Sequence, residues 1–284
     1  MNNSERNAII AKYIGSSQGR QRLAASMVNP LRSRRDYSSI GRKAFLVEQL
    51  PDGALSIYDK DPEVTAYVVS EEGDNIISQT RSARVHVPLF EIASNPQIAI
   101  TEIKARRFDL VDRALDKAKS EIQAAEDVRV FATMDAVADD PANPNVDINC
   151  VGDLTPGVLA DAFKEVEKYD LHVANIFMNP HDFSDVRKWD RDVLDPITQA
   201  ELLKTGYLAN VWGAKILCSR IVPQGTVYVC ADPEFFGRIP VRSELTVLSA
   251  DDPVGRKIGF SVFENIGVGC TNPWGLQRIK ITRQ

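Results

Sequence analysis

The longest stretch of this chain without glycine, between Gly73 and Gly152, is the feature that most restricts its fold. No proline interrupts it between Pro96 and Pro141. Within it, apolar residues recur every three or four positions, at Phe108, Val111, Leu115, Ala118, Ile122 and Ala125. Because this is the helical period, we predict one continuous helix over about residues 106–138. Such a helix is roughly three times the usual length of ~11–12 residues.

Segments with the composition of strands precede this helix. Residues 44–50 and 54–58 flank the turn signal Pro51-Asp52-Gly53, which predicts a hairpin. A further strand is predicted at 83–93, where Pro88 favours an edge or a bulge. Two or three strands of this kind are marginally stable alone, so we expect them to rest on another surface.

After residue 150 the elements become short and alternate in type. Thr155-Pro156 and Asn179-Pro180 have the cap-plus-proline pattern of helix starts. The pattern of apolar and turn residues predicts a further helix at 196–205. It predicts strands at 172–179, 215–220, 226–231, 245–250, 255–269 and 276–282. Strands therefore occur before and far after one very long helix, and the fold class is predicted to be α+β.

Charge is unevenly distributed along the chain. The net charge is −5, yet residues 1–43 contain nine basic and two acidic side chains, a net charge of +7 that leaves −12 for the remainder. This pattern predicts an interaction arm that contacts an acidic neighbour or the phosphates of a nucleic acid. The candidate contact residues are Arg20, Arg22, Arg32, Arg34, Arg35, Arg42 and Lys43.

Several protein classes are disfavoured by the sequence. No run approaches the ~20 apolar residues of a membrane helix, and the first residues lack the pattern of a secretory signal. The four cysteines are scattered without a C-x-x-C pair, which favours a reducing cytoplasm. Cys218 and Cys230 lie on consecutive predicted strands, so they are either two buried apolar side chains or a disulfide within or between subunits.

No arrangement of residues predicts catalysis. Glycine-rich phosphate loops are absent, so no cofactor is expected. His181, Ser184 and Asp185 supply the residue types of a catalytic triad, but the sequence around Ser184 has no nucleophile elbow. We therefore expect no catalytic, cofactor-binding or metal-binding residue. An enzyme that uses His172 or His181 would need a convergent polar site that the sequence does not indicate.

The order of elements resembles that of a known family. RRFDLVDRALDKAKSEIQAAEDVRVFATMDA (106–136) looks like a spine helix, HVANIFMNPHDFSDVRKW (172–189) and GYLANVWGAKILCSRIVPQGTVYVCADP (206–233) look like an axial domain, and GFSVFENIGVGCTNPWGLQRIKIT (259–282) is similar to closing strands. Together they resemble the major capsid proteins of tailed bacteriophages, which have the Hong Kong 97 fold.

The resemblance implies a division of the chain into four parts. These are a basic N-terminal arm at 1–43, an extended loop at 44–82, a peripheral domain at 83–150 and 250–284 that contains the spine helix, and an α/β axial domain at 151–249. The extended loop would lie over a neighbouring subunit. Its implied inter-subunit contacts are Asp52, Tyr58, Lys60, Glu63, Glu71 and Glu72.

The resemblance also implies a structural function. The chain would self-assemble into pentamers and hexamers that form an icosahedral head around double-stranded DNA. Its implied partners are a separate scaffold, a portal and decoration proteins, with non-specific contact to DNA and none to a membrane. Its implied location is the virion, after assembly in the host bacterial cytoplasm. An encapsulin-type compartment shell, whose partner is a cargo enzyme, is the alternative, and a cytosolic α/β enzyme is the third hypothesis.

Overall fold

A computed structural model describes residues 37–51, 53–59, 84–105, 110–141, 143–189 and 210–283. The chain divides into two compact units, which we describe separately. Unit 1 consists of Met1–Ser38, Ala93–Gln123 and Leu245–Glu264, and unit 2 of Ser39–Ile92, Ala124–Glu244 and Asn265–Gln284. Strands and helices occur in both units, and the predicted α+β class is confirmed.

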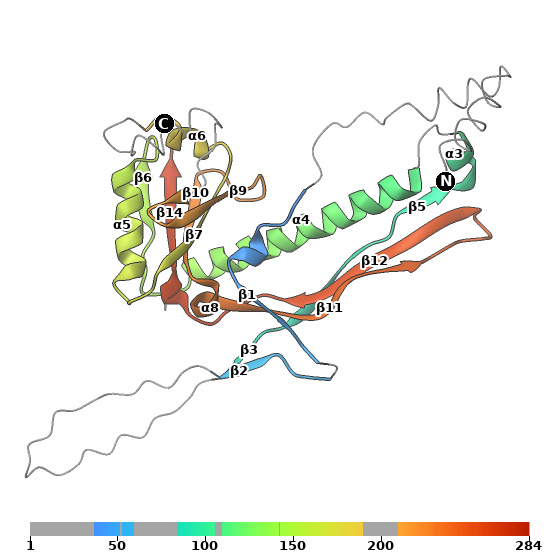
Figure 1. The fold of residues 1–284 in the computed structure, drawn as a ribbon, viewed down its shortest axis with the longest axis horizontal. Coiled ribbons are helices and arrows are strands. Elements are labelled where there is room, and N and C mark those ends of the chain that lie inside the picture. The colour runs from blue at the N-terminus through green and yellow to red at the C-terminus, as the bar shows by residue number, and fades with distance from the viewer. Residues whose placement is uncertain are drawn as a thin grey trace, which may run out of the picture. The chain divides into compact units, whose positions relative to one another are not determined.

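The predicted long helix is present as α4 (Leu110–Ala138), drawn in green in Figure 1. The expected start at 106–109 lies outside the described residues. Its apolar positions face inward, since Ala118 and Ile122 in unit 1 are buried. In unit 2 the same helix buries Val130, Phe131 and Met134 completely or nearly so. The absence of glycine and proline lets one helix of 29 residues contribute to both units.

Unit 2 is built on a six-stranded sheet with the order β6-β14-β10-β7-β9-β8. Its strands are β6 (Ile148–Val151), β7 (Val173–Met178), β8 (Asn210–Val211), β9 (Ala214–Cys218), β10 (Thr226–Ala231) and β14 (Leu276–Thr282). Strand β10 is antiparallel to both of its neighbours, whereas β7 pairs with β9 in parallel and β14 pairs with β6 in parallel. Helix α5 (Pro156–Glu167) starts at Thr155, whose hydroxyl accepts the N–H of Val158, as its cap-plus-proline pattern predicted.

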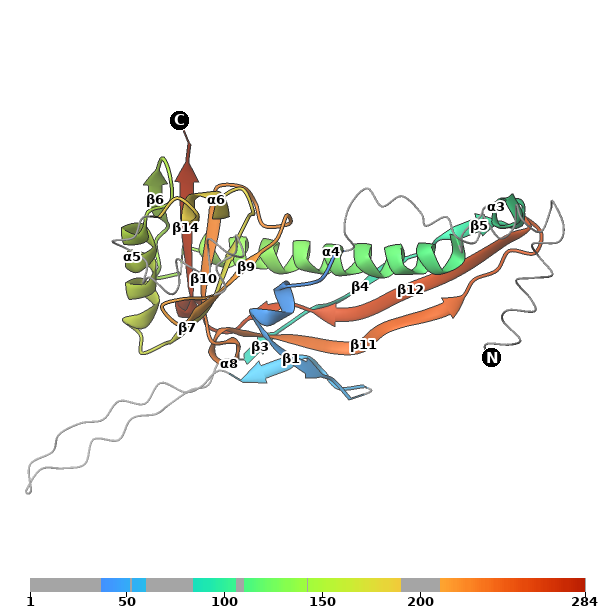
Figure 2. The ribbon, with the colours of Figure 1, turned by 45° about the horizontal axis from the view of Figure 1, so that its top comes forward.

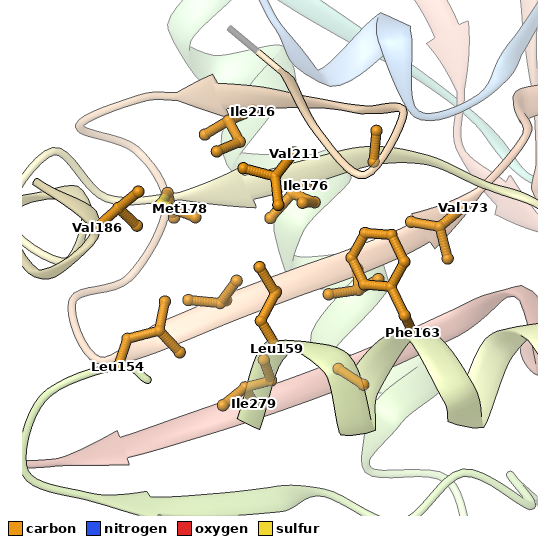
Figure 3. Packing of buried hydrophobic residues seen from close by; sticks show 14 of the residues in the cluster. Leu154, Leu159, Phe163, Val173, Ile176, Met178, Val186, Val211, Ile216 and Ile279 are labelled. Atoms are coloured by element: carbon orange, nitrogen blue, oxygen red, sulfur yellow. The ribbon is translucent and has the colours of Figure 1, made fainter. Parts of the chain in front are cut away.

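Both faces of this sheet are buried, because side chains alternate along each strand. Ile176 and Ile279 pack with Leu159 and Phe163 of α5 in one core, shown in Figure 3. Phe177 and Tyr228 point to the opposite core, where the ring of Phe131 from α4 lies 5.7 Å and 5.8 Å from theirs, centroid to centroid. The sheet is therefore held between α5 and the second half of α4.

The second sheet follows the order β1-β11-β12-β4, and Figure 2 shows β11 and β12 as neighbouring strands. Its strands are β1 (Leu46–Gln49), β4 (Leu89–Ser94), β5 (Gln97–Ala99), β11 (Gly237–Ser249), β12 (Lys257–Gly267) and β13 (Gly269–Cys270). A separate antiparallel pair joins β2 (Ile57–Asp59) to β3 (Arg84–His86). The short helices are η1 (Gly41–Lys43), α3 (Ile100–Ala105), α6 (Phe183–Val186), α8 (Pro233–Phe236) and η2 (Pro273–Gly275).

The predicted hairpin between 44–50 and 54–58 was wrong in its pairing. The turn is present, because the N–H of Ala54 donates to the carbonyl of Pro51 at 3.0 Å. Among the described residues, however, β1 pairs in parallel with β11, and β2 pairs with β3. The ladder with β11 continues to Leu50, whose N–H donates to the carbonyl of Val241. Strand β1 is therefore held by a strand far along the chain and not by its neighbour in sequence.

The expected grouping of residues 250–284 with the peripheral domain stays a prediction. The C-terminal strand β14 lies in the sheet of unit 2 between β6 and β10. Its alternation explains this placement: Leu276 is buried in the core beside α4, while Ile279 and Ile281 are buried in the core beneath α5. The helix expected to start at Asn179-Pro180 is the four-residue α6, and the one expected at 196–205 lies outside the described residues.

Within the described ranges, no helix combines the length and the apolar character that a membrane crossing requires.

Candidate functional site

Residues 39–45, which we call the strap, are fastened to one buried carboxylate of α4. Asp127 is fully buried, and its oxygens accept hydrogen bonds from the Ser39 hydroxyl at 2.7 Å and from the N–H groups of Ile40 and Gly41 at 2.9 Å. The strap ends at Ala44 and Phe45, which are buried in the core of unit 2. Asp127 thus fixes the point at which the N-terminal segment joins the folded unit.

Arg42 makes a contact within its own subunit, where its Nε donates to the carboxylate of Glu126 at 2.6 Å. The expected contact of this side chain with another subunit or a nucleic acid stays a prediction. Glu126 is buried, and burial raises the pKa of its carboxyl although the hydrogen bond and the charge of Arg42 act to lower it. A buried carboxylate is stable only with a partner, so the contact between Arg42 and Glu126 helps to hold the strap against α4. Lys43 is exposed, and its expected contact stays a prediction.

Most of the other predicted contact residues lie outside the described part of the chain. These are Arg20, Arg22, Arg32, Arg34 and Arg35 of the arm, and Asp52, Lys60, Glu63, Glu71 and Glu72 of the extended loop. Tyr58 is described, and the guanidinium of Arg238 lies 5.4 Å from the centre of its ring. Burial and the neighbouring carboxylate of Glu48 raise the pKa of the Tyr58 hydroxyl. Its contact with a second subunit stays a prediction.

Two buried carboxylates organise one end of the sheet in unit 2. Arg283 donates to Asp182 at 2.7 Å and to Asp185 at 2.9 Å, and both acids are almost completely buried. Burial alone would raise the pKa of Asp185, but the N–H of Leu154 and the cations Lys188 and Arg283 outweigh it and lower that pKa. These acids attach the C-terminal residues to α6.

This arrangement also accounts for the triad-like residue types around Ser184. The Ser184 hydroxyl donates to the backbone carbonyl of His181 at 2.7 Å, and the Nδ1 atom of His181 lies 3.8 Å from Asp182. In a catalytic pair the serine hydroxyl would donate to a nitrogen of the histidine ring. Here it donates to a backbone carbonyl one turn back, which is an ordinary contact within a helical turn. Within the described ranges, no group of three or more His, Cys, Asp or Glu side chains could hold a metal ion.

Sequence reasoning missed a second charged cluster around Arg278. This side chain is 3% exposed and contacts three carboxylates, those of Asp135, Asp139 and Asp147. Burial alone would raise the pKa of Asp147, but hydrogen bonds from Arg278 and Lys280 lower it. The cluster joins the end of α4 to β14. In the sequence, the cluster is indicated only by Arg278 and Lys280, which alternate with apolar residues along the strand. The same alternation is typical of a strand whose polar face contacts solvent.

The cysteine pair proposed from sequence does not form a bond within the subunit. Cys218 and Cys230 are both free thiols, on β9 and β10. Strand β7 lies between these two strands, so consecutive strands in sequence are not neighbours in the sheet. Burial raises the pKa of the Cys218 thiol to about 11 and raises that of Cys230 as well, which disfavours the reactive thiolate.

Large apolar side chains are exposed at several places. One group lies on and between β1 and β2, a second near the turn that joins β11 to β12, and others lie around the sheet of unit 2. They are Leu46, Val47, Leu55 and Ile57, then Val247, Leu248 and Val254, then Val146, Val151, Trp212, Phe235 and Trp274. Exposed apolar patches commonly mark surfaces that other proteins cover. These groups are the candidate contact surfaces of the described part of the chain.

No protein-family model and no curated protein matches this sequence. Solved structures do match it. The capsid structure of the cyanophage P-SCSP1u is 13% identical, with a TM-score of 0.71 over 91% of this chain and 92% of that one. The mature capsid of bacteriophage PhiM1 is 11% identical, with a TM-score of 0.67 over 90% and 91%. The capsid of a native GTA particle is 17% identical, with a TM-score of 0.65 over 90% and 96%.

These identities are low, and the likeness is one of fold. This chain has the fold of tailed-phage capsid proteins, and the Hong Kong 97 fold implied by the sequence resemblance is confirmed.

Proposed function

We propose that this chain is the repeated subunit of the icosahedral head of a tailed bacteriophage, assembling as pentamers and hexamers around double-stranded DNA. The extent of the structural likeness carries the proposal. The fold of several capsid proteins is matched over 90% or more of this chain and over 91% or more of theirs. A fold alone does not determine a function, so the surfaces of the chain must also suit a shell.

Those surfaces support the proposal. Exposed apolar residues on β1, β2 and the β11–β12 turn are costly for a subunit that remains alone in water. Contacts between different surfaces of identical subunits close into rings, which is how a shell can be built from one chain. The arm of net charge +7 and the remainder of net charge −12 are suited to such head-to-tail contacts.

The principal partner in this proposal is another copy of the chain. The resemblance adds a separate scaffold, a portal and decoration proteins. Packaged DNA would be contacted without sequence preference, through its phosphates. The proposed location is the virion, following assembly in the host bacterial cytoplasm.

Sedimentation velocity and negative-stain microscopy of the purified full-length protein test this function. We expect rings or closed shells whose amount rises with protein concentration. A monomer that persists at every protein and salt concentration would contradict it. Particles that contain nuclease-protected DNA agree with a phage head, whereas particles that copurify with a cargo enzyme indicate an encapsulin-type compartment.

A further inference from the structure

Three aromatic residues lie on neighbouring segments at one end of the sheet in unit 2. The rings of Tyr169 and Trp274 are stacked, with centroids 5.3 Å apart and planes at 19°. Helix α8, which contains Phe235, packs against η2, which contains Trp274. Trp274 is 43% exposed and Phe235 is 53% exposed. We call Tyr169, Phe235 and Trp274 the aromatic corner.

The backbone of this corner is held from both sides. The N–H of Trp274 donates to the side-chain oxygen of Asn272 at 3.2 Å, and the Trp274 carbonyl accepts from the side-chain nitrogen of buried Asn145 at 3.0 Å. Behind it, a Cβ on Gly275 would lie 3.1 Å from that of Ala231, so η2 is closely packed against the sheet. A half-exposed tryptophan on such a support is preorganised for a contact.

The segments that form the corner also carry acidic residues. These are Glu167, Asp170, Asp232 and Glu234. One cation is already present: the ammonium of Lys168 lies 4.8 Å from the centre of the Tyr169 ring. An arginine side chain suits segments that carry both an exposed aromatic ring and carboxylates, because its planar guanidinium stacks on rings and pairs with carboxylates.

The chain itself contains a segment of matching chemistry. Residues 1–36 carry seven basic and two acidic side chains, and the densest cluster is Arg32-Ser33-Arg34-Arg35. Fully extended, 36 residues can span about 120 Å at ~3.3 Å per residue, which is ample to reach another subunit. Phosphate is a poor occupant of the corner, since the carboxylates repel it.

We propose that the aromatic corner binds the arginine-rich segment 20–36 of a neighbouring copy, with a guanidinium group on the exposed part of Trp274 and others paired with the carboxylates of the segments that form the corner. The presence of neighbouring copies rests on the proposed function. The contact makes the arm a tie between subunits, and high salt weakens it because its charges are exposed.

Photo-cross-linking of the full-length protein tests this contact. Trp274→p-benzoylphenylalanine protein is mixed with 15N-labelled wild type, assembled, irradiated and analysed by mass spectrometry. Trp212→p-benzoylphenylalanine is the matched control, since Trp212 is also half-exposed (51%) but lies on the turn between β8 and β9. A third sample carries Arg32→Ala, Arg34→Ala and Arg35→Ala in the labelled partner.

We expect light–heavy cross-links from position 274 to peptides within 20–36, several-fold more abundant than from position 212. They should fall several-fold with the triple arginine variant or at high salt. Cross-links only within one copy, only to other segments or to DNA, or equal at both positions, would overturn the inference. Particles are scored first by microscopy: shells without these cross-links overturn this contact alone, whereas failure of the wild type to assemble also overturns the proposed function.

Discussion

The guanidinium of Arg278 donates to both oxygens of the Asp147 carboxylate, at 2.8 Å from Nε and 2.7 Å from Nη2. Because Arg278 is 3% exposed, Arg278→Ala leaves carboxylates without their cation, and we expect a loss of about 3 kcal/mol in the free energy of unfolding. Urea unfolding of the unassembled subunit measures it. The control is Lys280→Ala, which removes an exposed contact to the same carboxylate and should cost less than about 1 kcal/mol. Equal losses would show that burial of the pair is unimportant.

The close fit of the strap against α4 gives a second prediction. A Cβ on Gly41 would lie 2.6 Å from the carboxylate of Asp127 and 3.1 Å from Val130, so Gly41→Ala should destabilise the subunit by about 1–3 kcal/mol. Gly157→Ala is the matched control, because its Cβ meets nothing closer than 4.0 Å inside helix α5 and should stabilise by roughly 0.5–1 kcal/mol. If both variants melt like the wild type, the strap does not lie against α4 in solution.

The dependence of stability on pH follows from the charged clusters. Hydrogen bonds and cations hold the pKa values of Asp147 and Asp185 below the ordinary value of about 3.9. The unfolded chain then takes up protons first, so stability is lost as the pH falls below about 4. Glu126 acts in the opposite sense, because its raised pKa gives stability that is lost as the pH rises.

Melting temperatures between pH 7 and pH 3 measure this dependence. Asp185→Asn should have a lower melting temperature than the wild type at pH 7. Its melting temperature should fall less on acidification, since the asparagine side chain does not titrate. If the melting temperature of the variant falls as much as that of the wild type, Asp185 does not contribute to the loss of stability in acid.

Two N-terminal deletions separate the arm from the strap. Deletion of residues 1–36 leaves the donors of Asp127 in place, so we expect a subunit that melts normally but assembles poorly. Deletion of residues 1–43 also removes Ser39, Ile40 and Gly41, and should lower the melting temperature as well. Melting curves and particle yield are measured for both. Normal yield from the shorter deletion would show that the arm is dispensable, and equal melting would show that the strap contributes no stability.

Local signals in the sequence predicted the elements better than their pairing. The helical period located α4, and Thr155-Pro156 located the start of α5, because both depend on nearby residues. The partner of β1 could not be found in this way, because β11 begins at Gly237, far along the chain. The position of Cys230 beside β7 rather than β9 depends on sheet order in the same way.

The charged residues show why the contact surfaces were harder to predict. Arg42 reads as part of a basic arm, and only the burial of Glu126 assigns it to the strap. Arg278 and Asp185 look like residues of a solvated face until tertiary structure brings buried partners to them. The aromatic corner was missed because Tyr169 and Trp274 are distant in sequence and meet only because β7 and β14, the strands that follow them, are both antiparallel to β10.

Electron cryomicroscopy of particles formed by the full-length chain tests the central claim most directly. We predict an icosahedral shell of pentamers and hexamers in which each subunit contains α4 and the six-stranded sheet of unit 2. Discrete monomers or small open oligomers, with no closed shell at any concentration or in the presence of a scaffold, would contradict the account.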